Sequence, residues 1–311
     1  MPKVLFIDEV HPKMWTELER MGYRCADLTS ADKEEVLEKL PSAHGLVIRS
    51  RFTLDKDFLQ PATHLQWIAR SGVGLENIDL DYCREQDIQT FNAAGGNADA
   101  VGEHVIGMLL TLFNKLCSAD ASVRAGRWER EAHRGIELGA RTVGIIGYGN
   151  TGRSVAEKLS GFGCEVLAYD KYHPVDGPYA RKATLSEIQD ACDILSFHVP
   201  LTHETRHYLD EAFIDHMRQP LYLVNASRGP VCSTSSIVSG LKSGKILGAC
   251  LDVLEEEGPD LQLRSKENPF LQKLLSFSQV LLSPHVAGWT DSSYEKLADV
   301  LLEKIPRAEG H

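Results

Sequence analysis

Several features that would place the chain in a special class of protein are missing from its sequence. No apolar run approaches the ~18 residues that cross a bilayer, and the first residues, MPKVLFIDEV, lack a signal-peptide layout and instead predict a strand. The seven cysteines are scattered, and no two of them form a CxxC pair. We therefore expect a cytoplasmic protein with reduced thiols, with no disulfide framework and no bound metal.

Positive charge is also in short supply. Lys and Arg number 33 against 44 Asp and Glu, which leaves a formal charge of −11. This balance disfavours nucleic acid or an anionic membrane as a partner. A small anionic substrate remains possible if a few arginines gather locally. The 311 residues, 43% of them hydrophobic and 25% charged, suit a globular protein of two domains.

Short apolar runs alternate with amphipathic ones along the chain, which is typical of parallel βαβ units. Five strands are predicted in the first part, at 3–8, 23–28, 45–50, 66–71 and 88–92. Six more are predicted in the second part, at 141–146, 164–170, 193–199, 221–226, 246–253 and 279–285. Six strands with helices between them indicate a doubly wound dinucleotide-binding sheet.

Residues 99–119 are strongly apolar and predict one long connecting helix, buried either in the core of one domain or in a subunit interface. The last amphipathic segment, 292–305, has no strand after it, so we expect it to pack back on the first domain. These expectations define an α/β fold. A Rossmann doubly wound domain, residues 98–286, is inserted into a smaller flavodoxin-like α/β substrate domain, residues 1–97 plus 287–311.

The stretch GYGNTG, residues 147–152, lies between a predicted strand and a predicted helix. A lone GxGxxG is a weak signal, but this context is the one that a dinucleotide-binding loop requires. Gly147 permits a tight turn, Gly149 lets the backbone approach a pyrophosphate at the helix N-terminus, and Gly152 lets helix and strand pack closely. Asp170 ends the next strand, where it would bind the ribose hydroxyls and repel a 2′-phosphate. The predicted cofactor is therefore NAD rather than NADP.

Arg228, Glu257 and His285 each follow a different predicted strand of the second set. Each alone is more often structural, since Glu257 belongs to an acidic run and His285 follows a proline. Because ligands bind at the carboxyl ends of parallel strands, we expect the three to converge on a nicotinamide ring. Oxidising an alcohol by hydride transfer needs a group that moves the hydroxyl proton, which a histidine does in both directions. We predict that Glu257 orients His285 and that Arg228 grips a substrate carboxylate.

Taken together, GYGNTG…YD, NASRG, DVLEEEG and SPHVAG resemble, in order and spacing, the D-isomer-specific 2-hydroxyacid dehydrogenase family over essentially the whole chain. The resemblance implies the arginine, glutamate and histidine roles given above, a substrate domain interrupted by the NAD domain, and a homodimer. Leu254 and Gly258 depart from the family pattern, which usually has Phe and Pro there. Because Glu257 is present, we expect these departures to change the stiffness of the loop and not the chemistry.

The resemblance also implies contacts with the cofactor. Asp252 corresponds to the family residue that binds the nicotinamide carboxamide, and HVPLTHETRHYL resembles the family loop beneath the cofactor. The predicted cofactor-binding residues are Gly147, Gly149, Asn150, Thr151, Gly152, Asp170, His198, Val199, Pro200, Thr205, Ala226 and Asp252.

In the first part of the chain, IARSGVGLENID resembles the family loop whose backbone N–H groups hold the substrate carboxylate, and such a turn is also an anion nest on physical grounds. Upstream, Arg49 and Arg51 share one face of a strand end, and Arg70 precedes the glycine loop. Three arginines exceed the need of a monocarboxylate and would suit a second anionic group such as a phosphate. The predicted substrate-binding residues are Arg49, Arg51, Ser71, Gly72, Val73 and Asn97.

These segments are more similar to 3-phosphoglycerate dehydrogenases of the short type, without a C-terminal regulatory domain, than to glyoxylate or lactate enzymes. The expected reaction is NAD-dependent oxidation of D-3-phosphoglycerate to 3-phosphohydroxypyruvate, the first step of serine synthesis. Arg130 and Arg134 are candidates to reach a partner's substrate. One alternative is a hydroxypyruvate or glyoxylate reductase. Another is an NAD-sensing protein similar to the corepressors called C-terminal binding proteins. A formate dehydrogenase fits less well, because that branch has a glutamine near its active histidine.

Overall fold

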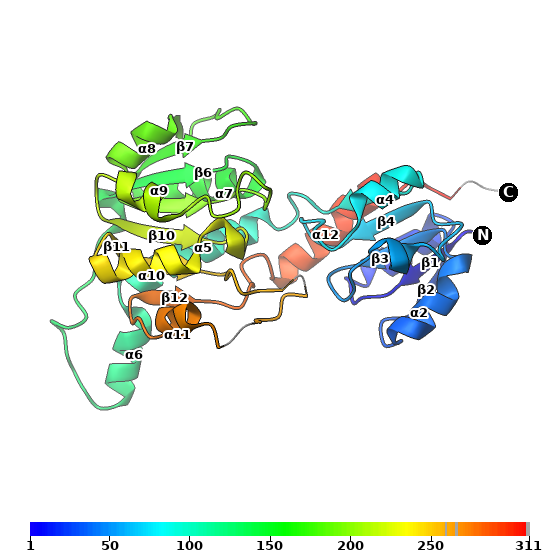
Figure 1. The fold of residues 1–311 in the computed structure, drawn as a ribbon, viewed down its shortest axis with the longest axis horizontal. Helices are drawn as coiled ribbons and strands as arrows, with labels where there is room; N and C mark the ends of the chain where they lie inside the picture. Colours follow the sequence, from blue (N-terminus) through cyan, green and yellow to red (C-terminus); the bar gives the residue numbers. More distant parts are fainter. Residues whose placement is uncertain (259, 265–266, 309–311) are drawn as a thin grey trace. The chain divides into compact units, whose positions relative to one another are not determined.

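A computed structural model of the chain describes residues 1–258, 260–264 and 267–308. The chain packs as two compact units (Figure 1). Unit 1 consists of Met1–Asn97, Gly258–Gln262 and Trp289–His311, and unit 2 consists of Ala98–Glu257 and Leu263–Gly288. Among the described residues, these ranges differ from the predicted domains at 258 and 260–262, which belong to unit 1, and at 287–288, which belong to unit 2. Across the described residues, every helix is too short or too polar to cross a bilayer.

Unit 1 is built on a five-stranded parallel sheet in the order β2-β1-β3-β4-β5. Its strands are β1 (Lys3–Phe6), β2 (Arg24–Asp27), β3 (Gly45–Ile48), β4 (Trp67–Arg70) and β5 (Gln89–Asn92). Its helices are α1 (Lys13–Arg20), α2 (Lys33–Lys39), η1 (Leu40–Ser42), α3 (Lys56–Leu59), α4 (Leu80–Glu85) and α12 (Asp291–Lys304). This strand order is the flavodoxin-like one, so the predicted fold class of this sheet is confirmed.

Alternate side chains of each strand in unit 1 point to opposite sides of the sheet. Each face of the sheet therefore contributes to its own buried apolar cluster. Leu5 and Leu46 face one buried cluster, and Val4 and Val47 face the other. The second cluster includes Leu297, Ala298 and Leu301 of α12 together with Met14 and Leu18 of α1. The last helix therefore packs on the first sheet, as the absence of a following strand predicted.

Unit 2 contains a seven-stranded parallel sheet in the order β12-β11-β10-β9-β6-β7-β8. Its strands are β6 (Thr142–Ile146), β7 (Glu165–Tyr169), β8 (Arg181–Lys182), β9 (Ile194–Phe197), β10 (Leu221–Asn225), β11 (Ile246–Leu251) and β12 (Val280–Leu282). The order is that of a Rossmann doubly wound sheet with one further strand at the β12 edge, and it confirms the predicted fold class. The sequence predicted six of these strands and missed β8, whose two residues are charged and exposed.

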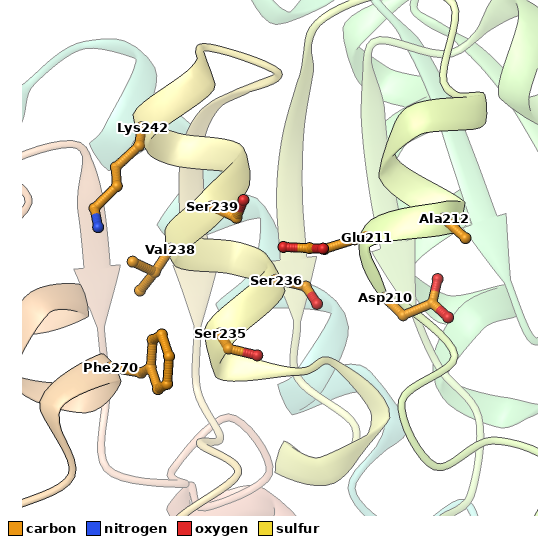
Figure 2. A pocket seen from close by; sticks show the side chains of 9 residues that line it. All are labelled: Asp210, Glu211, Ala212, Ser235, Ser236, Val238, Ser239, Lys242 and Phe270. Atoms are coloured by element: carbon orange, nitrogen blue, oxygen red, sulfur yellow. The ribbon is translucent and has the colours of Figure 1, made fainter.

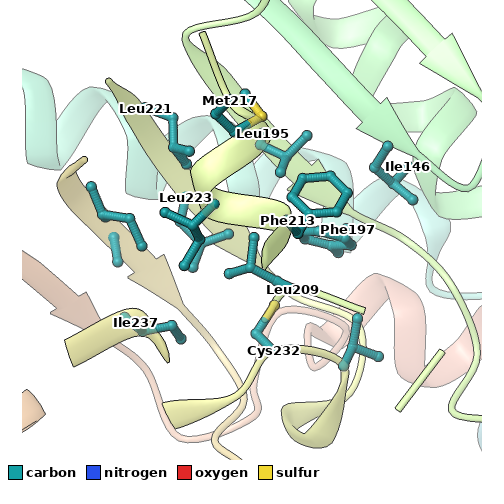
Figure 3. Close-up of a cluster of buried hydrophobic side chains, with 14 of the residues drawn as sticks. Ile146, Leu195, Phe197, Leu209, Phe213, Met217, Leu221, Leu223, Cys232 and Ile237 are labelled. Carbon is teal, nitrogen blue, oxygen red and sulfur yellow. The ribbon is translucent and has the colours of Figure 1, made fainter. Parts of the chain in front are cut away.

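The helices of unit 2 lie on both faces of this sheet. They are α5 (Ala98–Phe113), α6 (Leu116–Arg124), η2 (Leu138–Ala140), α7 (Asn150–Leu159), η3 (Ser160–Phe162), α8 (Leu185–Ala191), α9 (Glu211–His216), η4 (Gly229–Val231), α10 (Thr234–Ser243) and α11 (Pro269–Leu275). On one face, Phe197 of β9 packs on Phe213 of α9 in a large apolar cluster (Figure 3). On the other face, side chains of α5 and α7 form a second cluster.

The prediction of one continuous helix over 99–119 is wrong. Helix α5 ends at Phe113, and Lys115 adopts a left-handed φ of +52° before α6 begins. The Asn114 side chain donates to the Leu110 carbonyl (3.0 Å), and the Ile136 N–H donates to the Phe113 carbonyl (3.1 Å). Because these donors satisfy carbonyls at the end of α5, the helix can stop there. Helix α6 then runs away from the sheet of unit 2 (Figure 1).

Candidate active site

His285 and Glu257 meet at the carboxyl edge of the unit 2 sheet. Imidazole Nδ1 of His285 forms a short hydrogen bond with Oε1 of Glu257. The two side chains are only 26% and 13% exposed, so the pair is largely shielded from water and its electrostatic interaction is correspondingly strong. The two residues are separated by 28 positions in the chain, and the folding of β11 and β12 brings them together.

The backbone around His285 is held in an unusual conformation by Asp252. His285 has a left-handed φ of +54°, which costs energy for a residue other than glycine. Its N–H donates to the Asp252 carbonyl oxygen (2.7 Å). The buried Asp252 carboxylate accepts from the N–H groups of Val286 and Ala287, both at 2.9 Å. These three bonds fix the direction in which the imidazole leaves the backbone.

Arg228 stands on a turn that is clamped by Asn225, the last residue of β10. The buried Asn225 side chain donates to the Arg228 carbonyl (3.0 Å) and accepts from the N–H and hydroxyl of Ser227 (3.1 and 2.8 Å). The next residue, Gly229, lies directly against the loop that precedes Glu257. A Cβ atom at Gly229 would lie 1.8 Å from the Leu254 carbonyl oxygen. Only glycine allows the two loops to approach this closely.

The acidic run before Glu257 is not a solvated face. Glu255 accepts from the Thr234 N–H at the start of α10 (2.7 Å) and pairs with His207 Nε2 (2.6 Å). Glu256 accepts from the Thr234 hydroxyl (3.2 Å) and from the Asn268 side chain (2.9 Å), and burial raises its pKa. Both side chains anchor the loop to neighbouring helices.

The glycine loop has the geometry that its sequence predicted. Gly147 has a φ of +93°, and a Cβ atom at Gly152 would lie 2.0 Å from the Gly147 carbonyl oxygen. Beyond the adjoining residues of its own chain segment, no described residue has an atom within 4 Å of the position of a Cβ at Gly149. Helix α7 starts at Asn150 with Thr151 in its first turn, and no side chain caps it. Its first N–H groups are therefore suited to an anionic group such as a pyrophosphate.

Asp170 follows β7 and faces the glycine loop. One carboxylate oxygen accepts from the Tyr148 N–H (2.6 Å), and the other accepts from the N–H groups of Tyr172 and His173 (2.8 Å each). Burial by itself would raise the pKa of Asp170, but these three hydrogen bonds and the nearby His173 charge outweigh it and lower the pKa. Asp170 is therefore a carboxylate at neutral pH, as a ribose-binding residue requires.

The segment after β9 lies beneath the glycine loop. A Cβ atom at Gly147 would lie 2.5 Å from the His198 carbonyl oxygen and 2.8 Å from a Val199 methyl group. The imidazole of His198 is buried, its Nε2 pairs with the Ser196 hydroxyl (2.8 Å), and burial lowers its pKa to about 4. Its Nδ1 has no partner among the described residues. Thr205 donates to the Pro200 carbonyl (2.6 Å) and so closes the segment into a turn.

In unit 1, the loop that carries Arg49 and Arg51 folds around a carboxylate. Oδ2 of Asp8 accepts from three consecutive N–H groups, those of Arg49 (3.0 Å), Ser50 (2.7 Å) and Arg51 (2.9 Å). This is the donor arrangement of an anion nest, and the chain's own carboxylate fills it. Neither sequence segment alone indicates this contact, because Asp8 follows β1 and Arg49 follows β3.

The guanidinium groups of Arg49 and Arg51 have different partners. Arg51 donates to three carbonyl oxygens, those of Ile7 (3.2 Å), Leu28 (3.1 Å) and Ala31 (2.5 Å). The guanidinium carbon of Arg49 lies 4.4 Å from the centre of the Trp289 ring, a cation–π contact. The structure therefore does not bring the two predicted arginines together as one anion site.

The loop after β4 differs from the predicted arrangement of three amide donors. The Ser71 N–H donates to the Ile48 carbonyl and the Gly72 N–H to the Arg70 carbonyl, both at 2.8 Å. Two of the three predicted donors are thus already used within the chain. Arg70, the third arginine of the predicted group, donates through Nε to the Arg49 carbonyl (2.9 Å), and its Nη1 would lie 2.4 Å from a Cβ atom at Gly72.

The remaining predicted substrate residues have simpler surroundings. The Val73 carbonyl accepts from the Asn92 side chain (2.6 Å). The Asn97 side-chain oxygen is buried and has no hydrogen-bond partner among the described residues. Arg130 and Arg134 lie exposed between α6 and η2, where Arg134 pairs with Glu131 (2.5 Å).

An open depression of about 570 Å³ lies on the surface formed by α9, α10 and α11 (Figure 2). Its lining includes Asp210, Ser239, Lys242 and Phe270. None of the predicted site residues lines it. Its size alone therefore gives no reason to move the candidate site away from the strand ends.

Comparison with known proteins identifies the class. Residues 106–287 match the family model described as D-isomer specific 2-hydroxyacid dehydrogenase, NAD binding domain. The chain belongs to this family, and unit 2 contains its NAD-binding domain. Among solved structures, D-2-hydroxyisocaproate dehydrogenase is 25% identical with a TM-score of 0.84, over 97% of this chain and 95% of that one. D-lactate dehydrogenase from Aquifex aeolicus, complexed with NAD and lactic acid, is 26% identical with a TM-score of 0.79, over 97% and 93%.

Two curated relatives have equal identity and different activities. The D-3-phosphoglycerate dehydrogenase of Methanocaldococcus jannaschii is 33% identical over 99% of this chain, which spans only 57% of that protein. The hydroxypyruvate reductase of Thermotoga maritima is 33% identical over 88% of this chain and 87% of that protein. Sequence identity therefore does not choose between the two substrates.

Proposed function

We propose that the protein is an NAD-dependent oxidoreductase that acts on a D-2-hydroxy acid. The observation that carries this proposal is the shielded His285–Glu257 pair beside the Arg228 turn, at the carboxyl edge of an NAD-binding sheet. When bound, NAD supplies the acceptor for the substrate hydride. The catalytic groups of the chain then have to grip the acid and move one proton.

His285 moves that proton. Glu257 engages Nδ1, which leaves Nε2 to take the proton of the substrate hydroxyl during oxidation and to return it during reduction. The Glu257 carboxylate also stabilises the imidazolium that forms when the proton is taken. Arg228 binds the substrate carboxylate with its planar pair of donors and polarises the carbonyl oxygen of the oxo acid. A lysine at position 228 cannot reproduce this fork, so Arg228→Lys is expected to lower kcat/KM.

The cofactor residues suit NAD rather than NADP. The pyrophosphate would lie at the uncapped N-terminus of α7, where N–H groups and the helix dipole favour negative charge. The Asp170 side chain is only 7% exposed and is charged at neutral pH, and it stands at the end of β7, where it would bind the adenosine ribose and repel a 2′-phosphate. The buried Nδ1 of His198 offers a further polar atom under the glycine loop.

For the substrate, we propose D-3-phosphoglycerate, which would be oxidised to 3-phosphohydroxypyruvate and so enter serine synthesis. Arg49 and Arg70 support this choice in a protein of net negative charge, because Arg49 follows β3, Arg70 ends the neighbouring strand β4, and the Arg70 guanidinium group lies against Gly72 in the loop after β4. We propose that Arg51 has a structural role, since its guanidinium group serves three backbone carbonyls. With Arg51 engaged, fewer cations remain for a phosphate, which favours a hydroxypyruvate or glyoxylate reductase as the second candidate.

We also propose that the protein is a homodimer. The apolar side chains Leu116, Val123 and Trp128, on α6 and the segment after it, are 52%, 51% and 80% exposed. Leu116 and Val123 are seven positions apart and share one face of α6, and neighbouring exposed apolar groups mark association surfaces. Analytical ultracentrifugation of the wild type and of Trp128→Ser tests this proposal. A monomeric wild type at micromolar concentration would refute it.

One assay separates the candidate functions. NADH formation is followed with D-3-phosphoglycerate, D-glycerate and D-lactate, for the wild type, Arg49→Ala and the control Arg24→Ala, which removes an exposed arginine elsewhere in unit 1. We expect a preference for the phosphorylated acid that Arg49→Ala lowers by about tenfold, the size of one charge-assisted contact, and that Arg24→Ala leaves unchanged. Equal rates without phosphate favour the reductase. Tight NAD binding without turnover on any acid favours a corepressor-like sensor.

A further inference from the structure

Asp252 lies where three parts of unit 2 meet. It follows β11, its backbone carbonyl and carboxylate hold the loop with the left-handed His285, and its side chain is 1% exposed. Two further side chains reach the same carboxylate from outside this loop. Ser283, just after β12, donates its hydroxyl to Asp252 Oδ1 (2.6 Å). His104 on α5 has its Nε2 2.9 Å from the Ser283 hydroxyl and 3.6 Å from Asp252 Oδ1.

The direction of these hydrogen bonds follows from the groups involved. A carboxylate only accepts, so the Ser283 hydroxyl proton points to Asp252. The serine oxygen then accepts, and His104 donates through Nε2–H. The chain of donors runs from α5 through the end of β12 to the residue after β11. It links a helix on one face of the sheet to the loop that carries His285.

We propose that His104 and Ser283 are positioning residues that hold Asp252, and through it the strained His285 loop, in the geometry needed for proton transfer. This inference rests on the proposed function. The left-handed φ of His285 makes the loop sensitive to such support, because a strained conformation persists only where its surroundings over-determine it. Small displacements of an acid–base group lower the rate steeply even when its own contacts survive.

The surroundings of His104 decide which substitutions are informative. An open depression of about 290 Å³ beside it is lined also by Gly107, Met108 and Thr111 of α5. Truncation to alanine would admit a water molecule that can replace the Nε2–H donor. His104→Leu fills the space without a donor, and His104→Gln keeps a donor of similar reach. At the serine, Ser283→Ala removes the hydroxyl and Ser283→Thr keeps it.

The test measures kcat, KM and NAD affinity for these four variants and for the double variant Ser283→Ala/His104→Leu, with melting temperatures to verify folding. Ser243→Ala is the matched control, because it removes a hydroxyl that bonds the Gly240 carbonyl within α10 (3.2 Å). We expect Ser283→Ala to lower kcat by about tenfold and His104→Leu to lower it by about fivefold. The Thr and Gln variants should stay within about twofold of the wild type in kcat, and NAD affinity should fall by less than kcat in every variant.

The double variant is decisive because His104 acts through the Ser283 hydroxyl. Its kcat should equal that of Ser283→Ala alone, which is strong coupling in a double-mutant cycle. Additive losses, a loss in NAD affinity equal to the loss in kcat, or no effect of Ser283→Ala in an active enzyme would each overturn this inference and leave the proposed function standing. A wild type that turns over no 2-hydroxy acid would overturn the proposed function and this inference with it.

Discussion

The two sheets use the backbone N–H groups at their strand ends in opposite ways. In unit 1, three consecutive N–H groups after β3 converge on the carboxylate of Asp8. In unit 2, the Tyr148 N–H after β6 is likewise bonded to a carboxylate, that of Asp170, but the N–H groups of the first turn of α7 follow Gly149, which occupies the capping position and has no side chain to fill it. The backbone N–H groups after β3 therefore have a structural role, because a carboxylate of the chain binds them. Those at the start of α7 are suited to a ligand, because a glycine stands in place of a capping side chain.

The two units also treat their charged side chains differently. In unit 2, the Glu255, Glu256 and Glu257 carboxylates each have a side-chain partner, and Glu257 is paired with His285. In unit 1, Arg51 is bound to backbone carbonyls and Arg49 stacks on Trp289. Proton transfer requires side chains whose orientation is fixed by hydrogen bonds to their neighbours. Anion binding requires only positively charged side chains close to the loop that holds the anion. This contrast predicts larger effects on turnover in unit 2 and larger effects on KM in unit 1.

The largest effect is expected from His285→Ala. Loss of the acid–base group should lower kcat by about 10²–10⁴-fold while NAD binding, measured by fluorescence titration, stays intact. His64→Ala, which removes an exposed histidine in unit 1, serves as the control. Retention of wild-type turnover would show that His285 moves no proton and would remove the proposed contrast between the units.

The next largest effect is expected in the glycine loop. Substitutions there test which glycine is required for packing within the protein and which is required for ligand binding. Gly152→Ala would drive a methyl group against the Gly147 carbonyl, and we expect it to lower the free energy of unfolding by about 3 kcal/mol. The methyl group of Gly149→Ala meets no atom of a described residue outside its own chain segment within 4 Å, so this variant should keep its unfolding free energy. Its methyl group should instead weaken NAD binding by about tenfold, because the backbone can no longer approach the pyrophosphate.

Urea unfolding with and without NAD separates the two glycine variants. The two glycines sharpen the comparison because they lie in one loop and differ only in what a methyl group would meet. If Gly149→Ala binds NAD as tightly as the wild type, the open space above α7 is not the pyrophosphate site. The proposal for the cofactor would then have to be abandoned for this loop.

The third effect concerns pH and the buried His198. Its pKa is lowered from 6.5 to about 4 in the folded protein, so between these values the unfolded state binds more protons than the folded one. Stability contributed by the neutral imidazole is therefore present above pH 6.5 and is lost as the pH falls toward 4. Between pH 7 and pH 5 the loss should be about 2 kcal/mol.

Urea unfolding at the two pH values, for the wild type and His198→Gln, measures this effect. The variant should lose about 2 kcal/mol less than the wild type over the same interval. Parallel losses in the two proteins would mean that His198 does not titrate as a buried neutral group. The glycine loop would then rest on a more hydrated segment than the structure indicates.

What could be predicted from the sequence depends on how local its physical cause is. Buried strands such as β10 and β11 are marked by apolar runs, and the glycine loop by a strand–turn–helix pattern. Strand β8 has two exposed charged residues, and it pairs with β7 only because the sheet provides an edge. The break after Phe113 depends on the Asn114 side chain and on a distant N–H donor, so it left no trace in the apolar pattern of 99–119.

The same distinction applies to the candidate site. His285 and Glu257 were expected together because both follow adjacent parallel strands, and the structure brings them into contact. The engagement of Arg51 by three carbonyls and of the 49–51 loop by Asp8 could not be inferred, because the partners come from three other segments. Residue type and strand order predict which side chains lie at the same edge of a sheet. Tertiary packing determines which of these side chains already have hydrogen-bond partners within the protein.

The smallest effect tests the filled nest of unit 1. Asp8→Asn replaces a charged acceptor of three N–H groups by a neutral amide, which weakens charge-assisted hydrogen bonds and loosens the loop that carries Arg49. We expect KM for the phosphorylated acid to rise about fivefold, a loss of about 1 kcal/mol, with kcat and NAD affinity unchanged. Asp27→Asn is the matched control, because Asp27 accepts from Thr29 at the end of the neighbouring β2 and carries no arginine loop. A lower melting temperature for Asp8→Asn with an unchanged KM would mean that the Asp8 loop stabilises unit 1 and takes no part in substrate binding, so Arg49 would leave the proposed site as well.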